Sequence, residues 1–196
     1  MPNFLVDLTG CREIFWRSMT QDPTDTLMIR RGGVEDAGLI SVVGAATFYE
    51  AYFEQDQPAA LASYILESFS PDQIEREMAE PGSEFFIVFS DEKAVGYAKL
   101  RESPAGPGVT GKNAVELQRF YSIERVWGKG IGEILLNYVL DAARERGFDT
   151  LWLGVWVENM RGRRFYEKRG FTDTGGRLEF VYDAGVGINI VMQKKI

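Results

Sequence analysis

The feature that most constrains this chain is a glycine-rich turn between a strand-like run and an amphipathic run. Gly128, Gly130 and Gly132 fall within five residues, after the strand-like run 114–123 and at the start of residues 131–147, where apolar side chains recur at helical spacing. N–H groups at a helix N-terminus have no intrahelical partner, and glycine lets an anion approach them where a Cβ would collide. The sequence therefore predicts a strand–turn–helix unit that binds a pyrophosphate. A tight connection without a ligand is the alternative.

This turn matches neither of two common nucleotide-binding motifs. The Walker sequence Gly-x-x-x-x-Gly-Lys-Ser/Thr is absent, and Glu133 stands where a dinucleotide fingerprint has its third glycine. A literal Gly-x-Gly-x-x-Gly does occur at Gly106, Gly108 and Gly111, but prolines interrupt it and a strand-like run follows it. We interpret that second match as accidental.

The order of elements along the chain predicts a mixed sheet with helices on it. Thr150 to Val157 is almost continuously apolar, which is typical of a strand buried on both faces. Ser70 and Pro71 are expected to open a helix as its N-cap and first residue. We expect strands at 26–31, 84–89, 94–101, 114–123 and 150–157, and two closing strands after Gly170-Phe171, the last at 188–193. We expect helices at 34–53, from Pro58, from Pro71, at 131–147 and at 159–169.

Length and composition indicate one globular domain. The 196 residues fit a single core, and we expect residues 1–25 to be an N-terminal extension of a domain at 26–196. No apolar run approaches the roughly 18 residues that a membrane span needs. We therefore expect a cytoplasmic protein without a membrane partner.

Composition also limits the chemistry. The chain has no histidine and one cysteine, which excludes an internal disulfide and a Ser-His-Asp or Cys-His nucleophile and argues against a metal site. The net charge of −7 argues against binding nucleic acid. Residues 1–111 carry 8 basic and 18 acidic side chains, and residues 112–196 carry 14 and 11. The acidic half suits a cationic substrate and the basic half suits phosphates, although both distributions also serve solubility.

Two motifs carry a resemblance to a known family. Arg125-x-x-Gly128-x-Gly130 resembles the Arg/Gln-x-x-Gly-x-Gly/Ala signature of the GNAT N-acetyltransferases, which binds the pyrophosphate of acetyl-CoA there. Residues 159–171 resemble that family's Asn-x-x-Ala-x-x-Phe-Tyr-x-x-x-Gly-Phe, with Gly162 in place of the alanine. On these two motifs the chain is identified as a GNAT member. The resemblance implies an α/β fold with a central mixed, mostly antiparallel sheet of six or seven strands flanked by helices.

Shorter stretches narrow the resemblance. Residues 47–50, 82–85, 116–121 and 151–156 are similar to bacterial spermidine/spermine acetyltransferases, whereas residues 183–189 depart from the acidic stretch that this group often has. The resemblance implies direct transfer of an acetyl group from acetyl-CoA to a primary amine, either a polyamine or another small cationic amine, without a metal. A peptide N-terminus or a lysine is a rival substrate, and a non-catalytic acyl-CoA sensor is a rival function. The choice between a monomer and a homodimer stays open.

The catalytic roles follow partly from the resemblance. Tyr166 stands where the family keeps its general acid, although core packing would also explain its type. Without histidine the base is expected to be a carboxylate, and Glu116 on the strand entering the turn is the first candidate, acting through water. A salt-bridged strand residue is the equal alternative for Glu116, and Glu50 and Glu84 are weaker candidates.

The resemblance also implies the binding residues. A backbone N–H at a bulge around Phe120 and Tyr121 is expected to stabilise the developing oxyanion. Tyr49, Tyr52 and Phe53 are expected to line the acceptor pocket, because aromatic faces suit an amphipathic cation. The residues expected to bind acetyl-CoA are Phe120, Tyr121, Ile123, Arg125, Gly128, Lys129, Gly130, Ile131, Gly132, Glu133 and Asn159.

Overall fold

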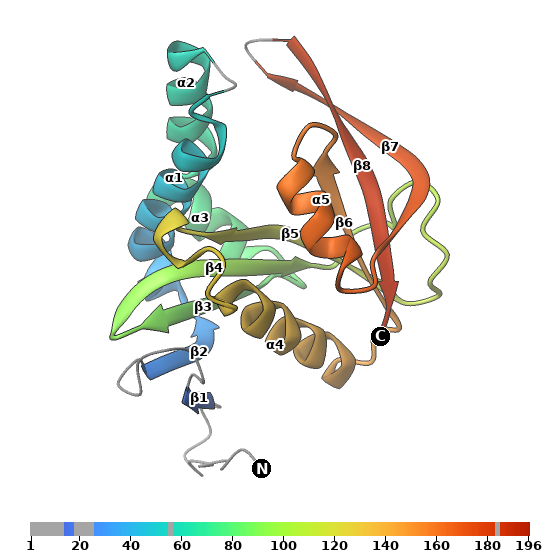
Figure 1. Ribbon diagram of the computed structural model, residues 1–196, viewed down its shortest axis with the longest axis horizontal. Helices are drawn as coiled ribbons and strands as arrows, with labels where there is room; N and C mark the ends of the chain where they lie inside the picture. Colours follow the sequence, from blue (N-terminus) through green and yellow to red (C-terminus); the bar gives the residue numbers. More distant parts are fainter. Residues whose placement is uncertain (1–13, 18–25, 55–56, 183–184) are drawn as a thin grey trace.

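The computed structural model describes residues 14–17, 26–54, 57–182 and 185–196 (Figure 1). Its centre is an eight-stranded sheet in the order β1-β2-β3-β4-β5-β6-β8-β7. Neighbouring strands are antiparallel except β5 and β6, which run parallel because the chain crosses between them through α4. The strands are β1 (Ile14–Arg17), β2 (Thr26–Gly32), β3 (Glu84–Ser90), β4 (Lys93–Arg101), β5 (Ala114–Ser122), β6 (Thr150–Trp156), β7 (Thr172–Tyr182) and β8 (Gly185–Lys195).

The helices begin and end at the residues that the sequence marks for this purpose. A proline opens both α2 and α3, and the Ser70 hydroxyl accepts a hydrogen bond of 3.3 Å from the N–H of Gln73. α4 ends before Gly147, whose φ of 83° lies in the left-handed region that glycine adopts without strain. The helical elements are η1 (Val34–Asp36), α1 (Ala37–Tyr52), α2 (Pro58–Ser68), α3 (Pro71–Ala79), η2 (Glu124–Val126), α4 (Ile131–Glu145) and α5 (Met160–Glu167).

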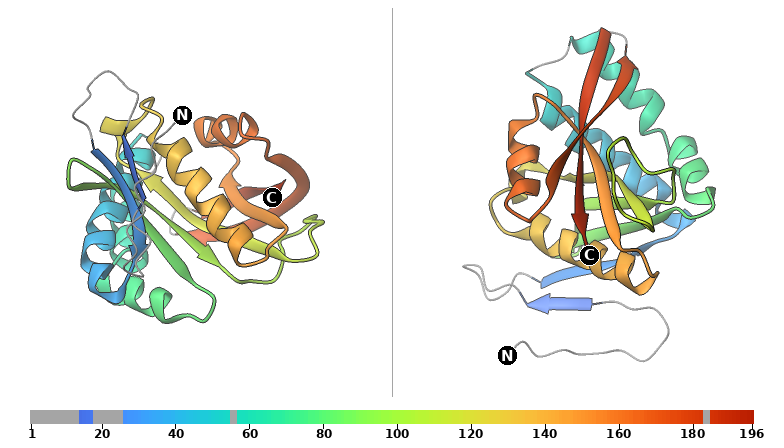
Figure 2. Two further views of the ribbon diagram at one scale, coloured as in Figure 1. Left: turned by 90° about the horizontal axis from the view of Figure 1, so that it is seen from below. Right: turned by 90° about the vertical axis from the view of Figure 1, so that its right-hand side faces the viewer.

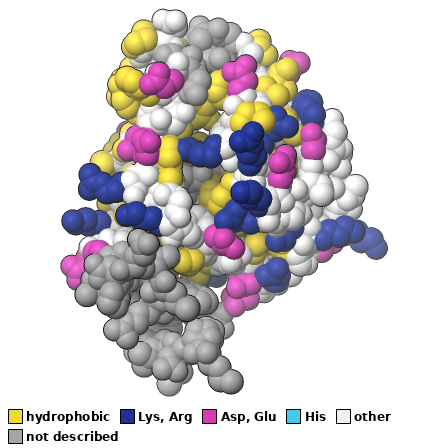
Figure 3. All heavy atoms as spheres, in the orientation of Figure 1, with side chains coloured by type: hydrophobic (Ala, Val, Ile, Leu, Met, Phe, Trp, Pro, Cys, Tyr) yellow, Lys and Arg dark blue, Asp and Glu magenta, His cyan; other side chains and the backbone are white. Residues whose placement is uncertain are grey.

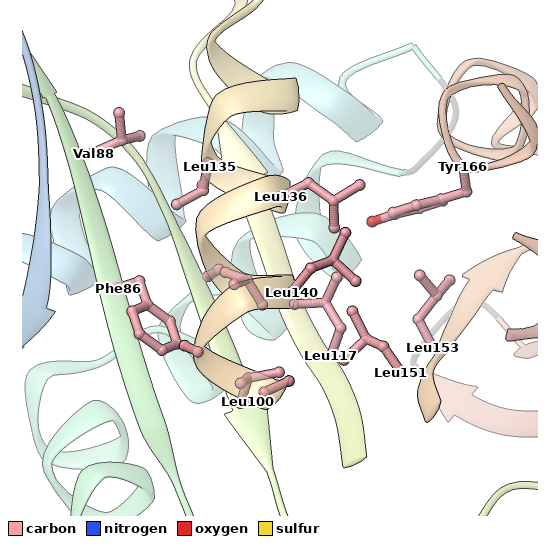
Figure 4. Packing of buried hydrophobic residues seen from close by; sticks show 14 of the residues in the cluster. Phe86, Val88, Leu100, Leu117, Leu135, Leu136, Leu140, Leu151, Leu153 and Tyr166 are labelled. Carbon is pink, nitrogen blue, oxygen red and sulfur yellow. The ribbon is translucent and has the colours of Figure 1, made fainter. Parts of the chain in front are cut away.

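The helices lie on both faces of the sheet, and each face has its own core (Figure 2). α4 and α5 cover one face, where Leu136 and Leu140 of α4 lie beside Leu117 and Leu151 of the central strands (Figure 4). α1, α2 and α3 cover the other face. That second core includes Ile40, Phe48, Phe69, Ile74, Phe85 and Tyr97.

The middle of the sheet is irregular at β5. Lys99 pairs with Arg119 and the next residue of β4, Leu100, pairs with Leu117, so that Gln118 is the extra residue of a β-bulge. β5 then pairs with β6 only over residues 114–116, and beyond Glu116 the two parallel strands separate. The bulge expected around Phe120 and Tyr121 therefore lies earlier in the strand, at Gln118.

The structure confirms the predicted α/β class and adds one strand to it. Residues 26–196 supply seven strands of the mostly antiparallel sheet, and β1 pairs with β2 as an eighth. β1 belongs to the stretch 1–25 that was predicted to be an extension, and the other residues of this stretch lie outside the described part. Among the helices that the structure describes, none is long and apolar enough to cross a membrane.

Candidate active site

A cavity of about 710 Å³ opens where β5 and β6 separate. One side of the cavity is formed by α1 and α2. The other side is formed by β5 and β6, by α5, by single residues of β7 and β8, and by the glycine-rich turn that precedes α4. The lining residues are Thr47, Phe48, Ala51, Tyr52, Ala60, Tyr64, Leu117, Gln118, Phe120, Tyr121, Ser122, Val126, Trp127, Gly128, Gly130, Gly132, Glu133, Gly154, Val155, Trp156, Asn159, Arg161, Gly162, Phe165, Tyr166, Arg169, Phe180 and Asn189.

One end of the cavity is built from the backbone of the glycine-rich turn. Gly128 and Gly130 have φ values of 76° and 82°, and a Cβ built on either would meet no atom within 4 Å. Gly130 is the N-cap of α4, and its carbonyl accepts the N–H groups of Glu133 and Ile134. The earlier N–H groups of the first helical turn have no intrahelical acceptor and lie at the positive end of the helix dipole. Open space in front of such groups fits a pyrophosphate.

Cationic side chains accompany this end. The guanidinium carbon of Arg161 lies 3.1 Å from the ring centroid of Trp127, whose Nε1–H donates to the Ser122 carbonyl at 2.9 Å. Burial lowers the pKa of Arg161, but a guanidinium stays protonated at neutral pH. Basic side chains gather on the face of the molecule near α5 (Figure 3). The charge of this wall therefore suits a phosphorylated ligand.

Asn159 lines the cavity and caps α5. Its Oδ1 accepts a hydrogen bond of 2.8 Å from the N–H of Gly162. A Cβ at Gly162 would approach the Asn159 amide nitrogen to 2.9 Å, so alanine at this position would require the cap to shift. Capping accounts for the residue type of Asn159, and its place in the lining leaves it within reach of a ligand.

Tyr166 of α5 lines the cavity. Its side chain extends toward α4 and β5, with the hydroxyl directed toward Leu136 and Leu117 (Figure 4). The residue is 8% exposed and its ring lies 5.4 Å from that of Phe171 and 6.2 Å from that of Phe120, measured between centroids. Burial raises the pKa of the Tyr166 phenol well above 10. The hydroxyl is therefore a protonated donor at neutral pH.

The opposite end of the cavity is aromatic. Phe48 lies at its centre, with ring centroids 4.4 Å from Tyr52, 4.6 Å from Tyr64 and 6.3 Å from Tyr121. The ring of Trp156 lies 5.5 Å from that of Tyr52. Burial raises the pKa of the Tyr121 phenol, which keeps it neutral. This end presents aromatic faces and neutral hydroxyl groups.

Carboxylates are scarce in the described lining. Its one acidic residue is Glu133, at the glycine-rich end, and the Glu133 carboxylate accepts from Arg169 at 2.8 Å. Glu50 caps η2 by accepting the N–H of Glu124 at 2.8 Å. Glu84 forms an ion pair of 2.7 Å with Arg31. The two weaker base candidates therefore already have partners outside the lining.

Glu116 is engaged by side chains outside the cavity. Its carboxylate accepts from Arg101 at 2.7 Å and from the Ser103 hydroxyl at 2.9 Å, and it does not belong to the lining. It sits in the part of β5 that still pairs with β6, before the strands separate. Its position therefore corresponds to the salt-bridged alternative and does not support a role as the base.

A buried ion cluster lies behind the aromatic end. Glu77 of α3 accepts from Arg119 at 2.6 and 2.9 Å and from Lys99 at 3.1 Å, while Arg119 also donates to the Ser68 carbonyl. Burial alone would raise the pKa of Glu77, but Arg119, Gln73 and Lys99 together lower it to about 2. The Arg119 guanidinium also lies 4.7 Å from the ring centroid of Phe69, which contacts Phe48 and Tyr121. The cluster thus holds Phe69 in place behind the aromatic end of the cavity.

The cavity brings together nine of the sixteen residues predicted from the sequence. Those within the lining are Tyr52, Phe120, Tyr121, Gly128, Gly130, Gly132, Glu133, Asn159 and Tyr166. Those outside the lining are Tyr49, Phe53, Glu116, Ile123, Arg125, Lys129 and Ile131.

The reasons for these seven positions differ. Tyr49 and Phe53 are exposed and contact each other on the outer side of α1, and Arg125 and Lys129 are also exposed. Ile123 and Ile131 pack against the core instead. The turn therefore contributes its backbone and Trp127, rather than its charged side chains, to the cavity.

Sequence reasoning missed part of the lining. The residues of the lining that were not predicted as site residues include Phe48, Tyr64, Gln118, Trp127, Trp156, Arg161 and Asn189. Helical spacing could have grouped Phe48 with Tyr52, because residues four apart share one face. Within the described residues, no three His, Cys, Asp or Glu side chains are grouped in a way that could hold a metal ion.

Comparison with known proteins gives a consistent result. The model of the acetyltransferase (GNAT) family matches residues 45–171. An uncharacterised N-acetyltransferase of Mycobacterium tuberculosis is 31% identical over 143 residues, which are 72% of this chain and 86% of that protein. A second one, from Lactobacillus delbrueckii subsp. lactis, is 29% identical over 130 residues, 66% of this chain and 75% of its own.

A solved structure shares the fold. The PaiA N-acetyltransferase of Thermoplasma acidophilum, determined in complex with coenzyme A, matches with a TM-score of 0.71 and 23% sequence identity. The match covers 87% of this chain and 99% of that one. At this identity the likeness concerns the arrangement of helices and strands.

Proposed function

The chain belongs to the GNAT family of acetyltransferases, and we propose that its acceptor is the primary amine of a small molecule that enters the aromatic end of the cavity. The protein is an N-acetyltransferase with acetyl-CoA as its co-substrate. Acetyl-CoA supplies an activated acetyl group on a thioester. The observation that carries the proposal is one cavity with a phosphate-compatible backbone at one end and an aromatic wall at the other.

The glycine-rich end binds the pyrophosphate in this proposal. The first-turn N–H groups of α4 donate to phosphate oxygens, and the absence of side chains at Gly128 and Gly130 leaves them accessible. Arg161, held against Trp127, adds a positive charge at the same end. These contacts fix the position of the thioester relative to β5.

The aromatic end receives the amine. An ammonium group is attracted to aromatic faces, and Phe48, Tyr52, Tyr64 and Trp156 offer several at once. Burial of the bound amine between these rings removes water from it, and this loss of solvation disfavours the charged form; in this proposal it outweighs the attraction of the rings, so that the pKa of the amine falls. Because the described lining has no carboxylate at this end, we propose that desolvation, rather than a carboxylate base, supplies the neutral amine that attacks.

Tyr166 provides the proton for the departing sulfur in this proposal. Its raised pKa keeps the hydroxyl protonated at neutral pH and above, and the residue lines the cavity from α5. Losing this proton donor slows the chemical step without removing a binding contact to the acetyl-CoA phosphates.

The charges of the lining favour one class of amine over the others. A polyamine carries several charges, and the described lining provides no carboxylate at the acceptor end to pair with them. An amine with one cationic group on an apolar or aromatic body suits the wall better, so we favour that class over spermidine and spermine. A peptide N-terminus or a lysine side chain is the second candidate acceptor, because a peptide also presents a single amine.

The decisive experiment measures thiol release from acetyl-CoA with aromatic monoamines, spermidine, spermine and short peptides, for the wild type, Tyr166→Phe and Tyr49→Phe. We expect turnover on aromatic monoamines, and a fall in kcat of about 100-fold or more in Tyr166→Phe with little change in the KM for acetyl-CoA. Tyr49 lies outside the cavity, so its variant should match the wild type. Turnover restricted to polyamines or peptides would refute the substrate class, and binding of acetyl-CoA with no turnover would favour the sensor.

Assembly and location stay predictions. The outer face of α1 exposes Leu39, Val42, Tyr49 and Phe53, and an apolar surface of this kind is a place to look for a second copy of the chain. A cytoplasmic location is expected from the sequence.

A further inference from the structure

We propose that Gln118 binds the substrate, with its side-chain carbonyl oxygen accepting a hydrogen bond from the attacking amine. This inference rests on the proposed function, because it names a contact for the acceptor amine within the same cavity. It adds a residue to the acceptor site that neither sequence motif includes.

The first observation is the bulge. Arg119 and Leu117 pair with consecutive residues of β4, Lys99 and Leu100, so that Gln118 has no partner across the ladder. A bulge re-aims the side chain of the extra residue and is frequent beside active sites. Here it falls two residues after Glu116, the last residue of β5 that pairs with β6. Gln118 therefore occupies the point at which the two strands open into the cavity, and it belongs to the lining.

The second observation is an unsatisfied polar atom. Within the described residues, the Oε1 atom of Gln118 is buried and has no hydrogen-bond partner. Leaving a buried acceptor unpaired is unfavourable, so such an atom in a native protein calls for an explanation. Its neighbours along β5 are engaged elsewhere, since Arg119 is bound to Glu77 and Tyr121 packs among aromatic rings. A donor supplied by a bound ligand would satisfy the Gln118 oxygen.

The chemistry of the cavity indicates an N–H donor. A primary amine has N–H groups to donate while its lone pair points elsewhere, which is the arrangement that attack on a carbonyl requires. An amide oxygen is uncharged, so it can orient the amine without the ion pair that would hold it as ammonium. An amide N–H in the arm of acetyl-CoA is the other source of the same donor chemistry, and the test separates the two.

The test compares Gln118→Met, which keeps the length of the side chain and removes the acceptor oxygen, with the wild type on the best amine substrate. We expect the KM for the amine to rise about five- to tenfold, while the KM for acetyl-CoA stays within about twofold, as befits the loss of one hydrogen bond. A rise in the KM for acetyl-CoA alone would assign the contact to the arm of the co-substrate and overturn the proposal. Unchanged values for both substrates would also overturn it.

A pH profile adds a measurement that a purely structural role would not change. Gln118→Glu places a carboxylate beside the bound amine, stabilises its ammonium form and should move the acidic limb of the kcat profile upward by about one pH unit. An acidic limb that stays in place would contradict the contact. Urea unfolding of both variants checks that the fold is retained.

The inference can be separated from the proposed function. If the wild type acetylates none of the amines, the proposed function fails, and the contact is then measured by binding alone. Trp127 and Trp156 line the cavity, so their fluorescence reports titration with the same amines in the presence of CoA. Weaker amine binding in Gln118→Met supports the contact without turnover, and equal binding in both proteins overturns it.

Discussion

The two ends of the cavity are built in different ways. At the glycine-rich end the binding groups are backbone N–H groups, which α4 holds on an apolar core. At the aromatic end they are side chains of α1, α2, β5 and β6, backed by a second core and a buried ion cluster. Backbone groups recognise a ligand that is the same in every member of a family, whereas side chains are free to change with the acceptor. This difference indicates that a sequence motif predicts the acetyl-CoA site better than it predicts the identity of the acceptor amine.

The largest expected effect tests whether the aromatic end depends on its buried charges. Glu77→Gln leaves the buried Arg119 without its anion and Lys99 with Glu80 alone, so the free energy of unfolding should fall by about 3 kcal/mol. Glu80→Gln is the matched control, because Glu80 also contacts Lys99 but its side chain is 44% exposed, against 6% for Glu77. The control should lose less than about 1 kcal/mol. Urea unfolding at pH 7 measures both.

The same pair gives a pH dependence with a definite sign. The pKa of Glu77 is lowered from 4.5 to about 2 in the folded state, so its contribution is complete above about pH 4.5 and is lost as the pH falls toward 2. The difference in unfolding free energy between the wild type and Glu77→Gln should therefore shrink on acidification. A difference independent of pH would show that packing, not charge, is responsible.

The next largest expected effect tests whether the glycine-rich end binds the phosphates of acetyl-CoA. Gly130→Ala puts a Cβ at a φ of 82° in front of the helix N-terminus and should weaken acetyl-CoA binding by about 1.5–3 kcal/mol, the cost of one charge-assisted hydrogen bond. Gly147→Ala is the control, since Gly147 has a φ of 83°, equally open surroundings and no place in the lining. Both variants should lose similar stability, about 1–2 kcal/mol. Calorimetric titration with acetyl-CoA separates binding from strain, and equal affinities would contradict the assigned phosphate site.

The smallest expected effect tests whether Tyr52 at the aromatic end contacts the amine. Tyr52→Leu removes a ring that lies beside Phe48 and Trp156, and the KM for the amine should rise roughly fivefold, equivalent to about 1 kcal/mol. Tyr49→Leu makes the same change less than one helical turn away, on the exposed side of α1. Steady-state kinetics with both substrates should show no change in the control and none in the KM for acetyl-CoA. If both variants behave alike, the aromatic wall does not hold the amine.

Particular residues show how far sequence reasoning reached at the site. Gly128, Gly130 and Tyr166 belong to contiguous motifs, and the structure places all three in the lining. Tyr49, Tyr52 and Phe53 were predicted together, but only Tyr52 faces the cavity, because the sequence does not say which side of α1 meets the sheet. Glu116 was selected for its residue type and strand, while its partner Arg101 lies on a neighbouring strand and Ser103 follows it. Long-range partners of this kind are invisible in a linear pattern.

The sequence by itself determined the α/β class, the helix boundaries at Ser70, Pro58 and Gly147, and the phosphate-compatible turn, because each depends on residues close together in the chain. The tertiary structure alone decided where β5 and β6 part, that Gln118 is the bulged residue, and that Glu77 meets Lys99 and Arg119. These features arise from strand register and helix docking, in which residues far apart in sequence are brought together by the burial of two cores. The glycine-rich end is therefore predictable from residues close together in the chain, whereas the aromatic end forms only when distant segments come together in the folded protein.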